Sequence, residues 1–260
     1  MHLQILFLLP AAFLQPPGAQ AGEIIGGRVA EPHSRPYMAY LQRKTPQAEK
    51  TCGGFLVRED FVLTAAHCAD GDIIVLLGAH NVWRKEETQQ RISVRRKIPH
   101  PRYNKTSHEN DLMLLQVPAP TAPSAHPGLA GQAVEPGSVC SVAGWGKTSR
   151  YARTSILHEV ELEVMADETC QEDELLQSYY KPSRMMCVGD PDEHKASFSG
   201  DSGGPLVCDG TAHGIVSFGK NDSSPPRVFT KVSAYVPWIK KTMKRLSSPG
   251  SHAESPASLH

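Results

Sequence analysis

A series of short apolar runs, bounded by glycine, proline or acidic residues, restricts the fold more than any other feature of the sequence. In residues 158–165, HEVELEVM, apolar residues alternate with glutamate, the period of a half-buried strand. The runs at residues 61–66, 72–77, 111–117 and 214–219 are apolar and partly β-branched, and they also predict strands. The sequence therefore indicates an all-β protein, either barrels or a sandwich.

Four further features complete this outline. Asp209-Gly210 separates two apolar runs and predicts a hairpin turn. One helix is expected over residues 233–246, with Ser233 as a possible cap, Pro237 in the first turn and basic residues at its end. Residues 116–137 are rich in proline, alanine and glycine and are interpreted as a linker between two halves. Residues 246–260 are polar and predict a disordered tail.

The charge balance argues against a nucleic-acid partner. The 260 residues carry 27 basic and 27 acidic side chains, so the formal net charge is zero. Basic residues gather in residues 84–97 and 240–245, and acidic ones in residues 159–174. Solvated faces usually explain such runs, and polyanion binding is the less favoured alternative. Nothing in the sequence indicates an organic cofactor.

The N-terminal residues resemble a secretory signal. An apolar run over residues 3–14 precedes Pro16-Pro17-Gly18, and Ala19-Gln20-Ala21 supplies small residues for a signal peptidase. The run is too short to span a bilayer, and no second run approaches that length. Because residues 1–21 contain no lysine or arginine, a buried N-terminal helix is the alternative. We expect residues 1–21 to be a signal peptide and the protein to be secreted without a membrane span.

The cysteines favour disulfides over metal ligands. Six cysteines follow the signal into an oxidising route, no CxxC pair exists and the histidines lack zinc spacing, so no metal site is expected. Six cysteines allow fifteen pairings, and the spacing alone does not choose among them.

Residues 197–208, SFSGDSGGPLVC, place Asp201 and Ser202 among glycines. Glycine permits unusual dihedral angles, so the segment suggests a strained turn that presents one hydroxyl. An ordinary surface loop is the alternative. Upstream, His67 ends the apolar run LTAAHC, and Asp111 precedes the run DLMLLQV. Taken alone, His67 is more simply a structural histidine and Asp111 a turn aspartate. Together they supply what acyl transfer by serine needs: a nucleophile, a base and a carboxylate that orients the base.

At this point the sequence resembles the trypsin-like serine proteases, through TAAHC, NDLMLL and GDSGGP in one chain and in that order. The segments GEIIGGRVAEPHSRPYMAYLQ, CGGFLVREDFVLTAAHC and LGAHN resemble more narrowly the granzyme, cathepsin G and mast-cell chymase group. The resemblance covers residues 24–245 as one protease domain. It implies two packed antiparallel Greek-key β-barrels with a C-terminal α-helix and the active site between the barrels.

The resemblance also assigns roles. It implies Ser202 as nucleophile, His67 as base and Asp111 as orienting acid, with the N–H groups of Gly200 and Ser202 as the oxyanion hole. Residues 22–23 become an activation dipeptide. Cleavage after Glu23, by a dipeptidyl peptidase, frees the amine of Ile24 to pair with Asp201. The implied disulfides are Cys52–Cys68, Cys140–Cys208 and Cys170–Cys187.

The same resemblance outlines a substrate pocket, lined by Ala196, Ser197, Phe198, Ser217, Phe218, Gly219 and Arg227. Ala196 stands where trypsin-like enzymes keep an aspartate, which argues against cleavage after lysine or arginine. Arg227, as in granzyme B, favours cleavage after Asp or Glu, since a confined guanidinium binds a carboxylate well. If Arg227 turns toward solvent instead, the pocket accepts Phe, Leu or Met, as in a chymotrypsin-like protease of cathepsin G or chymase type.

Further expectations rest on the secretory route and the group. Asn104 and Asn221 begin N-glycosylation sequons. Protein and peptide substrates, serpin-type inhibitors and granule proteoglycans are the expected partners, with storage in secretory granules of an immune cell. A proteolytically inactive heparin-binding or antimicrobial homologue is the alternative from another class. Removing Glu23 leaves 27 basic against 26 acidic residues (27 less one), so the mature chain is only weakly basic.

Overall fold

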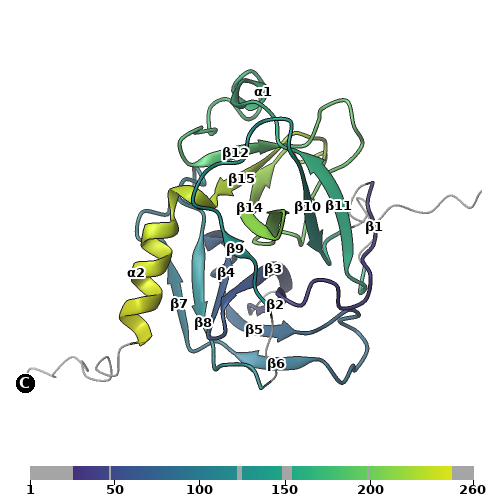
Figure 1. Ribbon diagram of the computed structural model, residues 1–260, viewed down its shortest axis with the longest axis vertical. Coiled ribbons are helices and arrows are strands. Elements are labelled where there is room, and N and C mark those ends of the chain that lie inside the picture. Colours follow the sequence, from purple (N-terminus) through teal and green to yellow (C-terminus); the bar gives the residue numbers. More distant parts are fainter. Residues whose placement is uncertain (1–25, 47, 122–124, 148–153, 198, 248–260) are drawn as a thin grey trace, which may run out of the picture.

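The computed structural model describes residues 26–46, 48–121, 125–147, 154–197 and 199–247. Two curled sheets built almost entirely from antiparallel pairs stack on one another, and helix α2 (Val236–Ser247) runs along one side of the lower sheet (Figure 1). The all-β prediction with a C-terminal helix is confirmed.

The first sheet contains seven strands in the order β6-β5-β2-β3-β4-β8-β7. Because β5 returns to pair beside β2, the neighbours β5-β2-β3-β4 form a Greek key. The strands are β2 (Met38–Lys44), β3 (Glu49–Arg58), β4 (Phe61–Thr64), β5 (Asp72–Leu77), β6 (Gln90–Ser93), β7 (Arg96–Pro99) and β8 (Met113–Gln116).

The second sheet contains eight strands, ordered β1-β11-β10-β13-β14-β15-β12, with β9 paired in parallel to β14. The turn between β13 and β14 is the predicted Asp209-Gly210 hairpin, and both residues have positive φ, 47° and 71°. The strands are β1 (Arg28–Val29), β9 (Gly128–Leu129), β10 (Val139–Gly144), β11 (His158–Glu163), β12 (Met185–Val188), β13 (Pro205–Cys208), β14 (Thr211–Gly219) and β15 (Arg227–Lys231).

The C-terminal helix begins later than the sequence suggested. Ser233 lies inside a separate 3-10 turn, Val232–Ala234, and α2 starts at Val236, so Ser233 does not cap α2. Pro237 is in the first turn, as expected, where a missing N–H costs nothing. The α2 side chains Ile239 and Met243 pack into the core of the first sheet. A second helix, α1 (Asp167–Gln171), was not predicted because one turn is too short to show a period.

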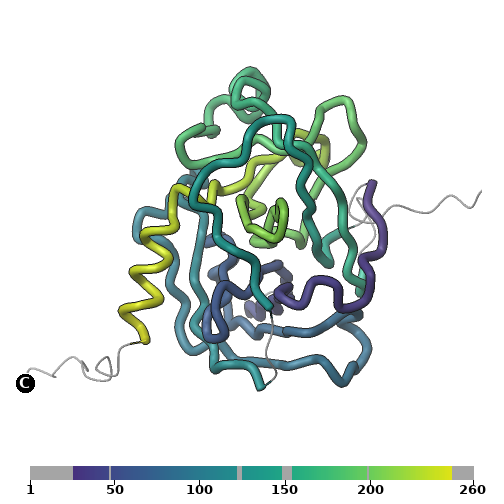
Figure 2. The backbone as a smooth tube through the Cα atoms, in the orientation of Figure 1, coloured from purple at the N-terminus to yellow at the C-terminus, as the bar shows by residue number. Residues whose placement is uncertain are grey.

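Three disulfides have the pairing that the resemblance implied: Cys52–Cys68, Cys140–Cys208 and Cys170–Cys187. The first lies within the seven-stranded half of the molecule, the second joins β10 to the end of β13, and the third fixes α1 to β12. The path from β8 across residues 116–137 into β10 joins the two sheets (Figure 2). This linker is not wholly irregular, since it contains β9; residues 122–124 lie outside the described part.

No helix among the described residues is long and apolar enough to cross a membrane. The expected signal peptide, residues 1–21, lies outside the described residues, as do the activation dipeptide and Ile24. Of the expected tail, residues 248–260 also lie outside, whereas residues 246 and 247 complete α2.

Candidate active site

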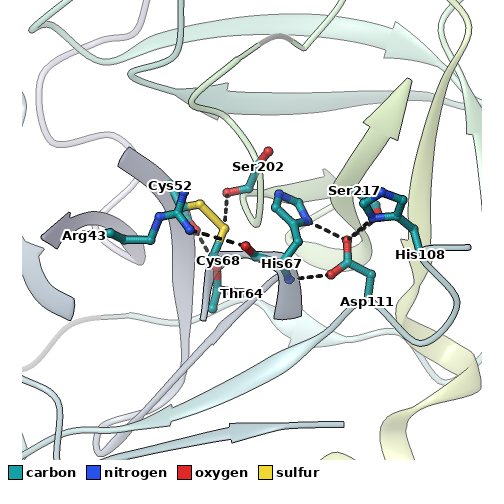
Figure 3. Close-up of a disulfide and its surroundings, with 10 residues drawn as sticks. Arg43, Cys52, Thr64, His67, Cys68, His108, Asp111, Ser202 and Ser217 are labelled. Atoms are coloured by element: carbon teal, nitrogen blue, oxygen red, sulfur yellow. Dashed lines mark hydrogen bonds and ion pairs between the residues drawn. A yellow bond between two sulfur atoms is a disulfide. The ribbon is translucent and has the colours of Figure 1, made fainter. Parts of the chain in front are cut away.

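Three chain segments bring His67, Asp111 and Ser202 together (Figure 3). His67 sits in a 3-10 turn, Ala66–Cys68, that follows β4, and Asp111 lies just before β8. Ser202 precedes β13 in the other sheet. The backbone N–H of Gly53, on β3, donates to the carbonyl of Ser202 at 2.8 Å, which ties the serine loop to the first sheet. The candidate site therefore lies where the two sheets meet.

Asp111 and His67 are joined by two hydrogen bonds. The backbone N–H of His67 donates to Asp111 Oδ1 at 2.9 Å, and His67 Nδ1 lies 2.7 Å from Asp111 Oδ2. An ionised carboxylate only accepts, so Nδ1 carries the proton and the lone pair of the neutral ring is on Nε2. This is the tautomer that a general base requires.

The carboxylate of Asp111 is fully buried yet kept ionised. Burial raises its pKa, but the electrostatic interaction with His67 and hydrogen bonds from its neighbours outweigh burial and hold the pKa well below its ordinary value. Ser217 is one of these neighbours: its Oγ donates to Asp111 Oδ2 at 2.5 Å. The sequence predicted Ser217 as part of a pocket wall; its hydroxyl also stabilises the buried acid.

The loop before β13 requires its glycines. Gly200 has φ of +109°, and a Cβ there would lie 2.8 Å from the Cα of Gly146. Gly203 has φ of +86°, and its Cβ would lie 2.1 Å from Thr64 Oγ1. Neither position accepts a side chain without moving its neighbours. The strained-turn interpretation of this segment thus agrees with the structure.

Ser202 borders a cavity of about 340 Å³. Within the described residues, neither the N–H of Gly200 nor that of Ser202 donates a hydrogen bond. The Ser202 hydroxyl and His67, both among the described residues, are not joined by a hydrogen bond (Figure 3). Such catalytic hydrogen bonds often form only when substrate is bound. The cavity is lined by Arg43, Lys50, Thr51, Cys52, His67, Lys147, Ser199, Gly200 and Ser202.

Asp201 points away from this cavity into the protein. It is fully buried, and its Oδ1 accepts from the N–H of Gly146 at 2.8 Å. A Cβ on Gly144 or Gly146 would lie 2.2 or 2.4 Å from that carboxylate. The two glycines thus give the buried acid its space.

The other candidate pocket residues lie around β14 and β15. Ala196 and Ser197 are fully buried, and Phe198 lies outside the described residues. Arg227, on β15, is 9% exposed and crosses Gly219, where a Cβ would lie 2.5 Å from its Nε. This is not the solvent-facing arginine of the alternative interpretation.

The guanidinium of Arg227 is only partly satisfied. Nη1 donates to the carbonyl of Lys220 at 2.6 Å, and the buried Nε has no partner among the described residues. Burial lowers the pKa of Arg227 to about 10, although the charges of Asp201 and Asp222 oppose this. A buried cation in this state gains from a carboxylate ligand.

The family model described as Trypsin matches residues 24–239. The chain belongs to the trypsin family. Human cathepsin G is 54% identical over 91% of this chain and 94% of its own length. Human granzyme B is also 54% identical, over 92% of this chain and 98% of its own.

Solved structures agree with this trypsin-family assignment. A chain titled "Structure of GrC" has a TM-score of 0.81 and 49% identity, covering 85% of this chain and all of that one. A further sequence relative, bovine duodenase-1, is 50% identical over 95% of this chain and 99% of its own length. The expected fold and the relation to granzymes and cathepsin G are thereby confirmed.

Sequence reasoning missed one residue at the centre of this site. His108 precedes Asp111 by three residues, and its Nδ1 lies 3.8 Å from Asp111 Oδ2. The histidine was visible in the motif HENDLM, but nothing in the spacing shows that the chain folds it back onto the acid.

The two sequon residues, Asn104 and Asn221, are exposed.

Proposed function

We propose that this protein is a serine endopeptidase in which Ser202 is the nucleophile, His67 the general base and Asp111 the orienting acid. The main support is the pair of hydrogen bonds from His67 to a buried, ionised Asp111, together with the position of Ser202 on the cavity that His67 also lines. Trypsin-family membership supports the same chemistry.

Each residue has a defined task. His67 Nε2 accepts the hydroxyl proton as Ser202 Oγ attacks the scissile carbonyl, and the N–H groups of Gly200 and Ser202 stabilise the oxyanion that forms. The protonated His67, held by Asp111, then gives its proton to the leaving amine. Water, deprotonated by His67, hydrolyses the acyl-enzyme and releases Ser202. One oxyanion donor contributes on the order of 3 kcal/mol.

Activation is proposed to follow cleavage after Glu23. The new amine of Ile24 would pair with Asp201, whose carboxylate is buried one residue before the nucleophile. An ion pair formed there orders the loop that carries Gly200 and Ser202, because a buried charge strongly favours an opposite one. The dipeptide Gly22-Glu23 fits removal by a dipeptidyl peptidase.

A fluorophosphonate probe tests both proposals, because it modifies only activated serines. The chain beginning at Ile24 is expected to be labelled, with the adduct on Ser202 by mass spectrometry. The chain beginning at Gly22 is expected to be labelled far more slowly. If the trimmed chain is not labelled, the catalytic proposal is wrong. If both chains are labelled at the same rate, only the activation proposal is wrong.

Cleavage after acidic residues is the proposed specificity. Arg227 is buried and only partly hydrogen-bonded, so a substrate Asp or Glu can supply a carboxylate partner. Ala196 offers no negative charge to a basic side chain. A chymotrypsin-like preference for Phe, Leu or Met is the alternative, and it requires Arg227 to leave its buried position.

Replacing Arg227 by alanine is expected to lower kcat/KM for substrates cut after Asp by about 10² to 10³, because the substrate carboxylate then has no cation. Cleavage after Phe should change by less than tenfold. The measurement is kcat/KM for peptides that differ only at the residue before the scissile bond. Arg91→Ala, at an exposed β6 position, is the control. Faster cleavage after Phe than after Asp by the unaltered protein would refute the acidic preference.

Compartment and partners follow from the resemblance and are proposed with it. We propose secretion, storage in granules of an immune cell, inhibition by serpin-type proteins and retention by granule proteoglycans. Exposure of Asn104 and Asn221 is compatible with N-glycosylation. The retained contacts of His67 with Asp111 speak against an inactive heparin-binding homologue.

A further inference from the structure

His108 places a second imidazole beside the catalytic pair. Its ring stacks on Phe218, with centroids 5.1 Å apart and an interplanar angle of 26°. The same ring meets His67 edge-on, at 5.9 Å and 84°. In Figure 3 the two imidazoles stand on either side of the Asp111 carboxylate. The mechanism above makes no use of His108.

The loop that carries His108 is held in an uncommon conformation. His108 and Asn110 both have left-handed φ, 54° and 57°. Such residues persist only where their surroundings fix them. The amide of Asn110 donates to the carbonyl of Arg102 at 2.7 Å and its Oδ1 accepts from Tyr235 at 3.2 Å. Together with the Phe218 stack, these contacts position the His108 ring before any ligand arrives.

The three side chains offer a compact set of metal ligands. One ligand atom each from His67, His108 and Asp111 lie within 4.8 Å of one another. His108 Nδ1 is buried and has no hydrogen-bond partner among the described residues. Asp111 Oδ2, 3.8 Å from this nitrogen, is too far for a hydrogen bond but suits a shared ion.

We propose that His67, His108 and Asp111 bind one transition-metal ion of the Zn²⁺ class, and that this ion inhibits the protease. Two imidazoles and a carboxylate are typical zinc ligands, with water completing a tetrahedron. Ligand bonds of about 2.0–2.2 Å place neighbouring donor atoms roughly 3.3–3.5 Å apart in such a site. Small side-chain shifts therefore bring the three donors to an ion. Cys52 and Cys68, which also adjoin His67, are disulfide-bonded and do not take part.

The bound ion would inhibit the protease because it occupies a nitrogen of His67 and the carboxylate of Asp111. An imidazole nitrogen of His67 that binds a metal is drawn away from its catalytic geometry, and Asp111 no longer serves His67 alone. The ring then cannot accept the Ser202 proton. This inhibitory half rests on the proposed function, whereas metal binding itself does not.

Binding is tested first in a chain that cannot turn over. The trimmed Ser202→Ala variant keeps all three ligands, and calorimetric titration with Zn²⁺ is expected to show one site per chain. Adding His108→Phe, which preserves the ring stack but removes the nitrogens, should weaken the affinity by about tenfold or more. His126→Ala, at an exposed histidine outside the cluster, should leave the affinity unchanged.

Co²⁺ gives a spectroscopic readout of the same site. Visible absorption typical of a tetrahedral nitrogen and oxygen site is expected with Ser202→Ala and should be lost when His108→Phe is added. Equal Zn²⁺ affinity with and without His108, or no stoichiometric site at all, would overturn the proposal even if the protein proves to be a protease.

Activity then tests the inhibitory role. The ratio of fluorophosphonate labelling rates with and without Zn²⁺ should fall steeply for the unaltered protein. In His108→Phe, about tenfold more Zn²⁺ should be needed for the same fall. Tight Zn²⁺ binding without any slowing of labelling would show that His67 is not a ligand, and would also overturn the proposal.

Discussion

Ser202→Ala is expected to lower kcat for peptide hydrolysis by on the order of 10⁶, with little change in KM. The hydroxyl is the only group removed, and without it no acyl-enzyme forms. The carbonyl of Ser202, which accepts from Gly53, is unaffected, so the loop should keep its place. Residual hydrolysis should come only from the oxyanion donors and substrate binding. Steady-state kinetics on one fluorogenic peptide measures the loss.

Ser93→Ala provides the matched control, because Ser93 is an exposed serine on β6. It should retain full activity, and both variants should have the Tm of the unaltered protein. Activity in Ser202→Ala within tenfold of the unaltered protein would remove Ser202 from the mechanism.

Asp111→Asn is expected to lower kcat by about 10⁴. An asparagine amide placed against His67 Nδ1 donates a proton instead of accepting one. The ring is then driven to the tautomer with its proton on Nε2, which cannot take the proton of Ser202. The backbone N–H of His67 can still donate to the amide oxygen at the place of Oδ1, and Ser217 Oγ can accept from the amide nitrogen at the place of Oδ2, so the site should persist while its proton transfer fails. The measurement is kcat near neutral pH.

Asp72→Asn, at an exposed β5 position, controls for the loss of a carboxylate.

The unfolding free energy gives an independent check. The pKa of Asp111 is lower folded than unfolded, so its ionised form stabilises the protein above its ordinary pKa. That contribution is lost as the pH falls toward the lowered pKa. The stability advantage of the unaltered protein over Asp111→Asn should therefore shrink below about pH 4; an advantage that grows there would contradict the assigned charge state.

Much of the fold was accessible from the sequence because strands and tight turns leave local signals. The alternation in residues 158–165 matches β11, and Asp209-Gly210 forms the hairpin between β13 and β14. The start of the last helix was misplaced at Ser233 because a 3-10 turn precedes α2 and shares its local preferences. Helix α1 was missed because a single turn has no period.

The candidate catalytic residues were also found from local motifs, since each lies in a short segment whose neighbours serve it. Gly200 and Gly203 are required by nearby backbone and side chains, and this requirement shows in the sequence as a glycine-rich turn. Ser217 and His108 were not recognised as partners of Asp111. They lie 106 residues after it and three residues before it, and neither separation predicts contact with its carboxylate.

Residue order and local pattern were thus enough to determine an all-β chain, its hairpin and a serine, a histidine and an aspartate in motifs suited to acyl transfer. Only the tertiary structure decided which polar atoms share the buried Asp111 carboxylate, and that Arg227 lies inside the protein and not toward solvent. The reason is physical. Strand and turn preferences act between neighbours in the chain, whereas burial and charge pairing depend on which distant segments the packed sheets bring together.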